Sequence, residues 1–228
     1  MNAENIIGSS WARIVGDQFE MNYMKRISKI VQHHRKHYRV FPPAHQVFRA
    51  FHLTPYEEVK VIIVGQDPYP TAGYANGLAF SYNPGTPQQM HTIPSSLKNI
   101  FEEVESDLGF TLYQSPDLER WARQGVLLLN TSLTVVEDRP GSHSTIGWRD
   151  FTRVVIQRLN NKDNQLVYLL WGRHAQSFIP MIKRHHEYLA TSHPSGRSAD
   201  KGFLGSRPFS NCNKILELSG QSPIDWTA

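Results

Sequence analysis

The segment Lys60-Val-Ile-Ile-Val-Gly-Gln-Asp-Pro-Tyr-Pro70 decides the fold of this chain. Its first half is a short run of β-branched side chains that stops at Gly65, which is typical of a strand buried on both faces of a sheet. Its second half holds the prolines Pro68 and Pro70, which cannot donate a hydrogen bond to a neighbouring strand. The segment therefore predicts a buried strand followed at once by a polar loop.

Three further apolar runs predict strands. They cover residues 126–129 and 166–170 and, more weakly, 188–191. We expect helices between them, and the strand and helix signals therefore alternate along the chain. This alternation predicts βαβ units and a parallel sheet covered on both faces. We expect an α/β fold, with three α/β/α layers around a central, mainly parallel four-stranded sheet and with residues 1–228 as a single domain.

The expected helices have recognisable ends. Ser96 or its neighbour can cap a helix that continues to Leu108 with apolar residues at the helical period. Ser115-Pro116 can open a second helix, which Gly125 can close. A third helix is expected from about Asp150.

Composition indicates an ordinary water-soluble protein. Of 228 residues, 39% are apolar and 19% are charged, and no apolar run is long enough to cross a bilayer. Cys212 is the only cysteine, which excludes an internal disulfide and agrees with a reducing compartment. The first residues do not have the pattern of a secretory signal. We expect a monomer without a membrane partner, in the cytoplasm or at the nucleoid.

The charge is unevenly distributed. The formal net charge is only +4, but the segment from Met21 to Tyr56 has seven Lys or Arg, five His and no acidic residue. Such a segment would attract a polyanion. It would equally be explained as the solvated face of a helix. Both interpretations stay open at this stage.

Polar residues follow three of the four predicted strands, where parallel sheets bind ligands. Asp67 follows the first strand and could orient a water or stabilise a positive charge, although Asp-Pro is also a common turn. Asn130 follows the second strand, and its amide could read the edge of a base or serve a turn. His193 follows the fourth strand, ahead of Pro194, where a lone His is more often structural.

These three residues lie within a longer series of motifs that extends over nearly the whole chain. The segments are Phe41-Pro-Pro-Ala-His-Gln-Val-Phe48, 61–69, 76–81, 93–97, 121–131, 142–143, 147–148, 170–176, 193–195, 202–203 and 223–226. In their order and spacing they resemble the first, highly specific family of uracil-DNA glycosylases. The resemblance implies a DNA-repair enzyme that flips uracil out of single- or double-stranded DNA and hydrolyses its N-glycosidic bond.

The resemblance also implies roles at the sugar and on the face of the base. Gln66 and Asp67 would line the pocket, with Asp67 turned toward the attacking water and the sugar. Because bond cleavage builds a cation on the sugar, a nearby carboxylate lowers the barrier. Phe80 would stack on the extruded uracil. No cofactor and no metal ion are implied.

Three other residues would recognise the base, by the same resemblance. Asn130 would read the O4 and N3–H edge, where cytosine has the opposite donor and acceptor pattern. Tyr69 would press against C5, where thymine carries its methyl group. His193 would donate a hydrogen bond to O2 from a neutral imidazole and stabilise the departing uracil anion.

The resemblance further assigns the DNA backbone to small hydroxyl donors. Ser96, Ser142, Ser195 and Ser198 would clamp the phosphates that flank the lesion, contacts that position a strand without reading its sequence. The implied partners are uracil-containing DNA and DNA-mimicking inhibitor proteins.

Two positions depart from the family pattern. Pro70 stands where a His usually follows the Tyr, so a side-chain hydrogen bond near the catalytic water is either missing or supplied by another group. Arg197, in Gly196-Arg197-Ser198, stands where the family usually has the Leu that fills the space of the flipped base. Arg197 either replaces that wedge with its stem and planar head or only meets the DNA backbone.

Other functions were weighed against this one. Five histidines (His33, His34, His37, His185 and His186) could suggest a metal hydrolase, but they form no known zinc pattern. A P-loop sequence is absent, which disfavours nucleotide hydrolysis. A non-catalytic DNA-binding or scaffold protein with the same fold remains an alternative. A glycosylase of broader base preference is disfavoured by Tyr69 and Asn130.

Overall fold

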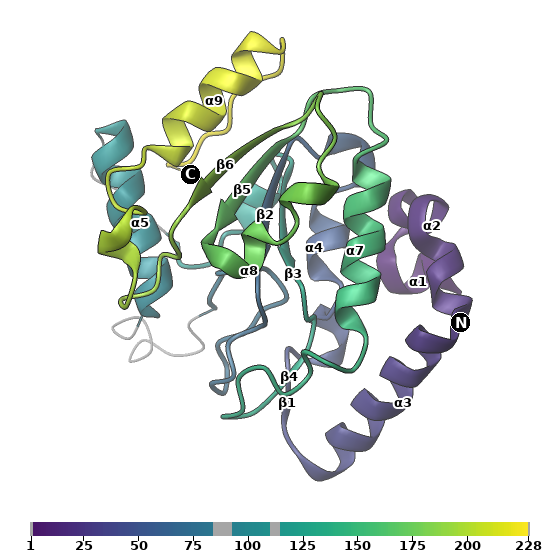
Figure 1. The fold of residues 1–228 in the computed structure, drawn as a ribbon. Coiled ribbons are helices and arrows are strands. Elements are labelled where there is room, and N and C mark those ends of the chain that lie inside the picture. The colour runs from purple at the N-terminus through teal and green to yellow at the C-terminus, as the bar shows by residue number, and fades with distance from the viewer. Residues whose placement is uncertain (1, 84–92, 110–114, 228) are drawn as a thin grey trace.

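The fold is centred on a sheet of four parallel strands in the order β3-β2-β5-β6 (Figure 1). A computed structural model describes residues 2–83, 93–109 and 115–227. The strands are β2 (Val61–Gly65), β3 (Val126–Asn130), β5 (Val167–Trp171) and β6 (Glu187–Thr191). All four predicted strands are confirmed. The order reverses at β2, because the chain goes first to β3 on one side and later to β5 on the other.

The three inner strands form the centre of the core. Every residue of β2, β3 and β5 is buried, as their uninterrupted apolar sequences predict. Ile63 of β2, for example, lies between its register partners Leu128 and Leu169. The strand β6 is an edge strand with exposed positions, which explains its weaker apolar pattern.

Helices cover both faces of the sheet, so the three-layer α/β/α arrangement is confirmed. Figure 1 shows α4 and α7 on one face, with α1, α2 and α3 outside them, and α5 and α9 on the other. The helices are α1 (Ala3–Ile7), α2 (Ser9–Val15), α3 (Asn22–His37), α4 (Arg49–Leu53), α5 (Ser95–Leu108), α6 (Glu119–Ala122), α7 (Trp148–Leu159), α8 (Gly172–Gln176) and α9 (Pro208–Leu218). Within the described part of the chain, no helix combines the length and the apolar character that a membrane span requires.

Two expected helix starts are wrong. The helix α6 begins at Glu119 and not at Pro116, because residues 115–118 are held as a loop: the Asp117 N–H donates to Ser115 Oγ and the Tyr82 N–H donates to the Pro116 carbonyl. Ser96 does not cap α5. The cap position is Pro94, which has no side-chain hydrogen bond to the helix, and Ser96 lies in the first turn.

Other elements escaped the sequence analysis. The basic segment contains α3, which buries Met24 and Ile27 and leaves its cationic side chains largely outside, so much of the charge there belongs to a solvated helix. The helix α9 was not predicted. A small antiparallel sheet of β1 (Val40–Phe41) and β4 (Val135–Val136) was also missed, because strands of two residues leave no periodic signal.

We predict that Ile63→Ala lowers the free energy of unfolding by about 2–5 kcal/mol, because it opens a cavity between three fully buried strands. Urea unfolding followed by far-UV circular dichroism measures this change. Leu218→Ala is the matched control, since Leu218 is 80% exposed and its truncation should change stability by no more than about 0.5 kcal/mol. Equal effects of the two substitutions would contradict the prediction.

Candidate active site

A cavity of about 210 Å³ opens at the carboxyl ends of the strands. Its volume lies below the range of about 300–1,000 Å³ usual for drug-sized ligands, so it suits a single small ring. The lining residues are Gly65, Gln66, Asp67, Pro68, Tyr69, Pro70, Leu78, Phe80, Ser96, Asn130 and His193. The structure therefore brings together the residues predicted at the ends of three different strands.

A larger cavity of about 510 Å³ lies beside α3 and α4. Apolar side chains such as Phe19, Met24 and Phe48 form most of its wall, and no carboxylate occurs among the described residues that line it. It therefore offers a mainly apolar surface, and its described lining holds no carboxylate that could stabilise a cation. The smaller cavity is the candidate active site.

Two glycines allow the walls of the smaller cavity to come close together. A Cβ on Gly65 would lie 2.2 Å from Asn130 Oδ1, closer than any side chain could tolerate. Gly172 has φ +85°, which favours glycine, and a Cβ there would lie 2.8 Å from His193 Cβ. Asn130 itself is buried, and within the described residues its amide has no hydrogen-bond partner. Both the donor and the acceptor of that amide are thus free to pair with a ligand.

Asp67 is held by the main chain of a distant turn. The Gly141 N–H donates to Asp67 Oδ2 over 2.6 Å. Burial raises the pKa of Asp67 above its ordinary value, while the Gly141 hydrogen bond and the nearby His174 oppose that rise. The turn therefore fixes the direction of the carboxylate and favours its ionised form.

His193 has one ring nitrogen occupied by its own turn. The Ser195 N–H donates to His193 Nδ1 over 3.0 Å, so Nδ1 carries no proton. Burial, together with the positive charge that His174 can acquire, lowers the pKa of His193. The ring is therefore favoured as a neutral imidazole whose only N–H is at Nε2, which makes it a hydrogen-bond donor in the wall of the cavity.

Phe80 adopts a backbone conformation that is rare for a bulky residue. Its φ is +61°, in the left-handed region. The Tyr69 hydroxyl donates to the Phe80 carbonyl over 3.2 Å, which ties the two aromatic lining residues together. The Phe80 ring lies 5.4 Å from that of Trp171 and 5.7 Å from that of His193, measured between centroids. The aromatic wall is thus built from three strand-end segments.

The structure adds a relay that the sequence analysis did not assign. Thr131 Oγ1 donates to the Gln66 carbonyl over 2.8 Å and lies 2.6 Å from His174 Nε2. Because the Thr131 hydrogen is already used, His174 Nε2–H is the donor in the second contact. The relay fixes the peptide next to Asp67. The only indication of His174 in the sequence is that it lies within the motif 170–176.

The four predicted backbone-clamping serines lie in different surroundings. Ser96 lines the cavity in the first turn of α5. Ser142 Oγ accepts from the Val136 N–H. The Ser198 hydroxyl donates to the His193 carbonyl over 2.8 Å and lies 2.9 Å from Ser195 Oγ, so the Ser195 hydrogen points to Ser198. Only Ser96 lines the cavity.

The side chains of Gln66 and Arg197 are exposed. Gln66 nevertheless belongs to the cavity wall, whereas Arg197 lies outside it, in the turn that follows His193. Within the described residues, Arg197 has no hydrogen-bond or ion-pair partner. Its guanidinium therefore adds no polar contact to the described part of the fold.

The histidines that suggested a metal site do not form one in the structure. Among the described residues, no group of three or more His, Cys, Asp or Glu could hold a metal ion. His34 Nδ1 instead lies 2.9 Å from Nε2 of the buried His143, whose Nδ1 lies 2.7 Å from Thr134 Oγ1. Burial is the main reason why the pKa of His143 falls to about 4.

Comparison with known proteins agrees with this geometry. The family model of the "Uracil DNA glycosylase superfamily" matches residues 51–217. A uracil-DNA glycosylase of Pseudomonas paraeruginosa is 45% identical over 221 residues, covering 96% of this chain and 94% of the relative. One of Brevibacillus brevis is 43% identical over 222 residues, covering 97% of this chain and 95% of the relative.

Solved structures are similar as well. The mimivirus uracil-DNA glycosylase superposes with a TM-score of 0.87 at 24% identity, covering 99% of this chain and 89% of that chain, a likeness of fold alone. A variant of the mimivirus protein in complex with UGI superposes with a TM-score of 0.85 at 25% identity, covering 96% and 88% of the two chains.

We predict that His193 stays mainly neutral, with its proton on Nε2, at pH values near 6.5, where an ordinary histidine is half-protonated. A lowered pKa means that the folded protein binds fewer protons than the unfolded chain there. The stability that this group contributes is therefore present above about pH 6.5 and is lost as the pH falls through the folded pKa. A ¹⁵N NMR titration of the imidazoles tests this. A proton on Nδ1, or a pKa at or above 6.5, would contradict it.

Proposed function

Because the chain belongs to the uracil DNA glycosylase superfamily, we propose that the cavity at the carboxyl ends of β2, β3 and β6 is where it cuts uracil from DNA. The chain is a DNA-repair enzyme that hydrolyses the N-glycosidic bond of uracil and leaves an abasic site. The observation behind the assignment of the site is the convergence of Asp67, Phe80, Asn130 and His193 on one small cavity. The alternative of a non-catalytic DNA-binding protein is not favoured.

Base recognition follows from the shape and the polar groups of the cavity. Phe80 offers a flat face on which the flipped uracil stacks. The unpaired amide of Asn130 pairs with O4 and N3–H, and cytosine would leave both of its groups unsatisfied. Tyr69, held by its hydroxyl on Phe80, closes the space at C5 and excludes thymine.

Two residues assist the hydrolysis, one at the departing base and the other at the sugar. As the C1′–N1 bond breaks, its electron pair leaves with uracil, and the His193 Nε2–H donates to O2 to stabilise the resulting anion. The Asp67 carboxylate, held by the Gly141 N–H, stabilises the cation on the sugar and orients a water whose oxygen bonds to C1′. The proton released by that water passes through Asp67 to solvent.

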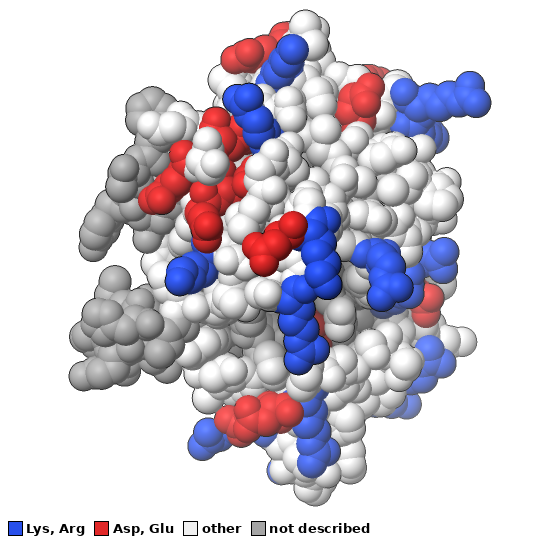
Figure 2. Space-filling view, turned by 60° about the vertical axis from the view of Figure 1, so that its left-hand side comes forward, with Lys and Arg blue, Asp and Glu red and all other residues white. Residues whose placement is uncertain are grey.

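The DNA strand is held through its phosphates. Ser96 at the N-terminus of the 14-residue α5 combines a hydroxyl with backbone N–H groups that have no partner among the described residues, a favourable place for an anion. We assign Ser142, Ser195 and Ser198 to flanking phosphates, for which Ser195 must turn its hydrogen away from Ser198. Figure 2 shows Lys and Arg side chains in a band down the middle of one face, which would attract the phosphate backbone.

The wider setting follows from the substrate. We propose that the chain acts as a single catalytic domain and as a monomer, in the cytoplasm or at the nucleoid, where DNA is found. UGI, which binds the mimivirus relative, is the model for a DNA-mimicking inhibitor protein that would cover the same surface.

The proposal predicts that purified protein converts a uracil-containing single-stranded oligonucleotide into alkali-labile abasic sites without added metal. Asp67→Asn and His193→Ala should each slow excision by about 10²–10³-fold, because each removes charge stabilisation from the transition state. Chromatography of released uracil measures this. If the wild type released no uracil, or if both variants were fully active, the assignment of the active site would be contradicted.

Arg197→Ala tests whether Arg197 fills the space left by the flipped base. We predict that the substitution slows excision from duplex DNA by roughly tenfold and from single-stranded DNA much less, since only the duplex requires unstacking and unpairing, at about a few kcal/mol. Lys201→Ala, which removes another exposed cation from the same loop, is the control. Equal losses on both substrates would instead indicate simple contact with the backbone.

A further inference from the structure

The segment 76–82, which carries Phe80, is fastened to the loop 115–118 by side-chain hydrogen bonds. Asn76 Nδ2 donates to Ser81 Oγ over 2.8 Å, and the Ser81 hydroxyl donates to Asp117 Oδ1 over 3.2 Å. The Leu118 N–H donates to the same Ser81 oxygen over 3.0 Å. Ser81 is buried and directly follows Phe80. The hydrogen bonds of its hydroxyl therefore anchor the main chain next to the aromatic ring.

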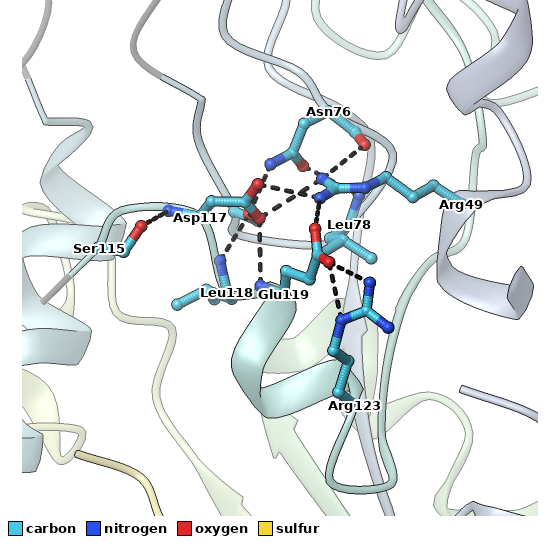
Figure 3. A network of polar contacts seen from close by, with 9 residues as sticks. Arg49, Asn76, Leu78, Ser115, Asp117, Leu118, Glu119 and Arg123 are labelled. Carbon is cyan, nitrogen blue, oxygen red and sulfur yellow. Dashed lines mark hydrogen bonds and ion pairs between the residues drawn. The ribbon is translucent and has the colours of Figure 1, made fainter. Parts of the chain in front are cut away.

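Arg49 of α4 binds this junction from the other side (Figure 3). Its guanidinium donates to Asp117 Oδ2 over 2.9 Å and to the Asn76 carbonyl over 3.3 Å. It also pairs with Glu119. The side chain of Arg49 is only 17% exposed, so these charged hydrogen bonds are partly shielded from water. One cation thus joins α4, the segment 76–82 and the start of α6.

At this junction, the main chain of the segment 76–82 packs very closely against the residues at the start of α4. A Cβ on Gly77 would lie 2.0 Å from the Gln46 carbonyl oxygen and 2.9 Å from Arg49 Cβ, and Gly77 has φ +89°. The segment 76–82 therefore passes directly over the start of α4. This close approach gives the guanidinium of Arg49 a fixed position relative to the Phe80 backbone.

Phe80 needs such support because its conformation is strained. A bulky residue in the left-handed region is strained and persists only where the surroundings enforce that conformation. On the strand side, the Ala79 N–H donates to the Leu128 carbonyl and the Tyr69 hydroxyl donates to the Phe80 carbonyl. The residue after Phe80 is restrained by the hydrogen bond from the Ser81 hydroxyl to Asp117.

We propose that Arg49 is a positioning residue for uracil binding, which holds Phe80 in its stacking conformation through Asp117 and Ser81. The inference rests on the proposed function, in which Phe80 forms the stacking face. Without Arg49, the neighbouring carboxylates of Asp117 and Glu119 repel each other, and the loop that anchors Ser81 moves. Phe80 then relaxes toward an unstrained backbone, and the stacking face is lost from the cavity.

The test compares Arg49→Met with Arg123→Met. Arg123 binds the same Glu119, but its side chain is 63% exposed and it contacts neither Asp117 nor the segment 76–82. Free uracil, used as a competitive inhibitor of excision from a single-stranded oligonucleotide, probes the cavity directly. We expect Arg49→Met to weaken inhibition by uracil about tenfold, the effect of losing one base-stacking contact, and Arg123→Met to leave it unchanged.

A double-mutant cycle with Phe80→Ala separates positioning from general damage to the fold. If Arg49 acts through the Phe80 ring, Arg49→Met adds little further loss of uracil affinity in the Phe80→Ala background. The pH profile of kcat should keep its shape, since Asp67 and His193 are untouched. Should Arg49→Met fail to fold, Ser81→Ala breaks the same connection with a smaller change and should weaken uracil binding in the same way.

The outcomes distinguish this inference from the proposed function. Absence of uracil release by the wild type would overturn the function itself. Normal release by the wild type, with the same uracil inhibition constant in Arg49→Met and Arg123→Met, would overturn only the positioning role. An equal loss with and without the Phe80 ring would overturn it too, because the effect would then pass through some other part of the cavity.

Discussion

The site depends on how closely the carboxyl ends of β2 and β3 approach each other. Gly65 and Asn130 are register partners, and the missing side chain of Gly65 is the space into which the Asn130 amide fits. Because every residue of both strands is buried, a shift of register would displace all of their packed side chains. The same register that packs the core therefore also fixes Asn130, for which we propose base recognition, and the peptide that leads to Asp67.

Around this fixed edge, the polar groups of the site are oriented by main-chain atoms. Gly141 and Ser195 each donate a backbone N–H, one to Asp67 and one to His193. Backbone donors move only with their loops, so both side chains are oriented before any ligand arrives. Phe80 differs, since its strained conformation depends on side chains of three other segments. The aromatic wall is therefore the part of the site most sensitive to distant substitutions.

Much of this was readable from the sequence. Buried strands have local signatures, and the rule that ligands bind beyond their carboxyl ends brought Asp67, Asn130 and His193 together before any coordinates were known. Most of the failures have a common cause. The start of α6, the strands β1 and β4, and the network around Arg49 depend on contacts between residues far apart in the chain. Short-range propensity does not encode such contacts.

The departure at Pro70 shows how the surroundings can replace a missing side chain. The Pro70 carbonyl accepts from the Asp138 N–H over 3.0 Å, and three residues later in the same turn Gly141 donates to Asp67. Two hydrogen bonds donated by main-chain N–H groups of the turn 138–141 thus join it to the loop after β2. A proline ring limits φ without affecting its carbonyl, so Pro70 keeps this connection and stiffens the loop. The carboxylate of Asp67 therefore keeps its orientation although no imidazole stands at position 70.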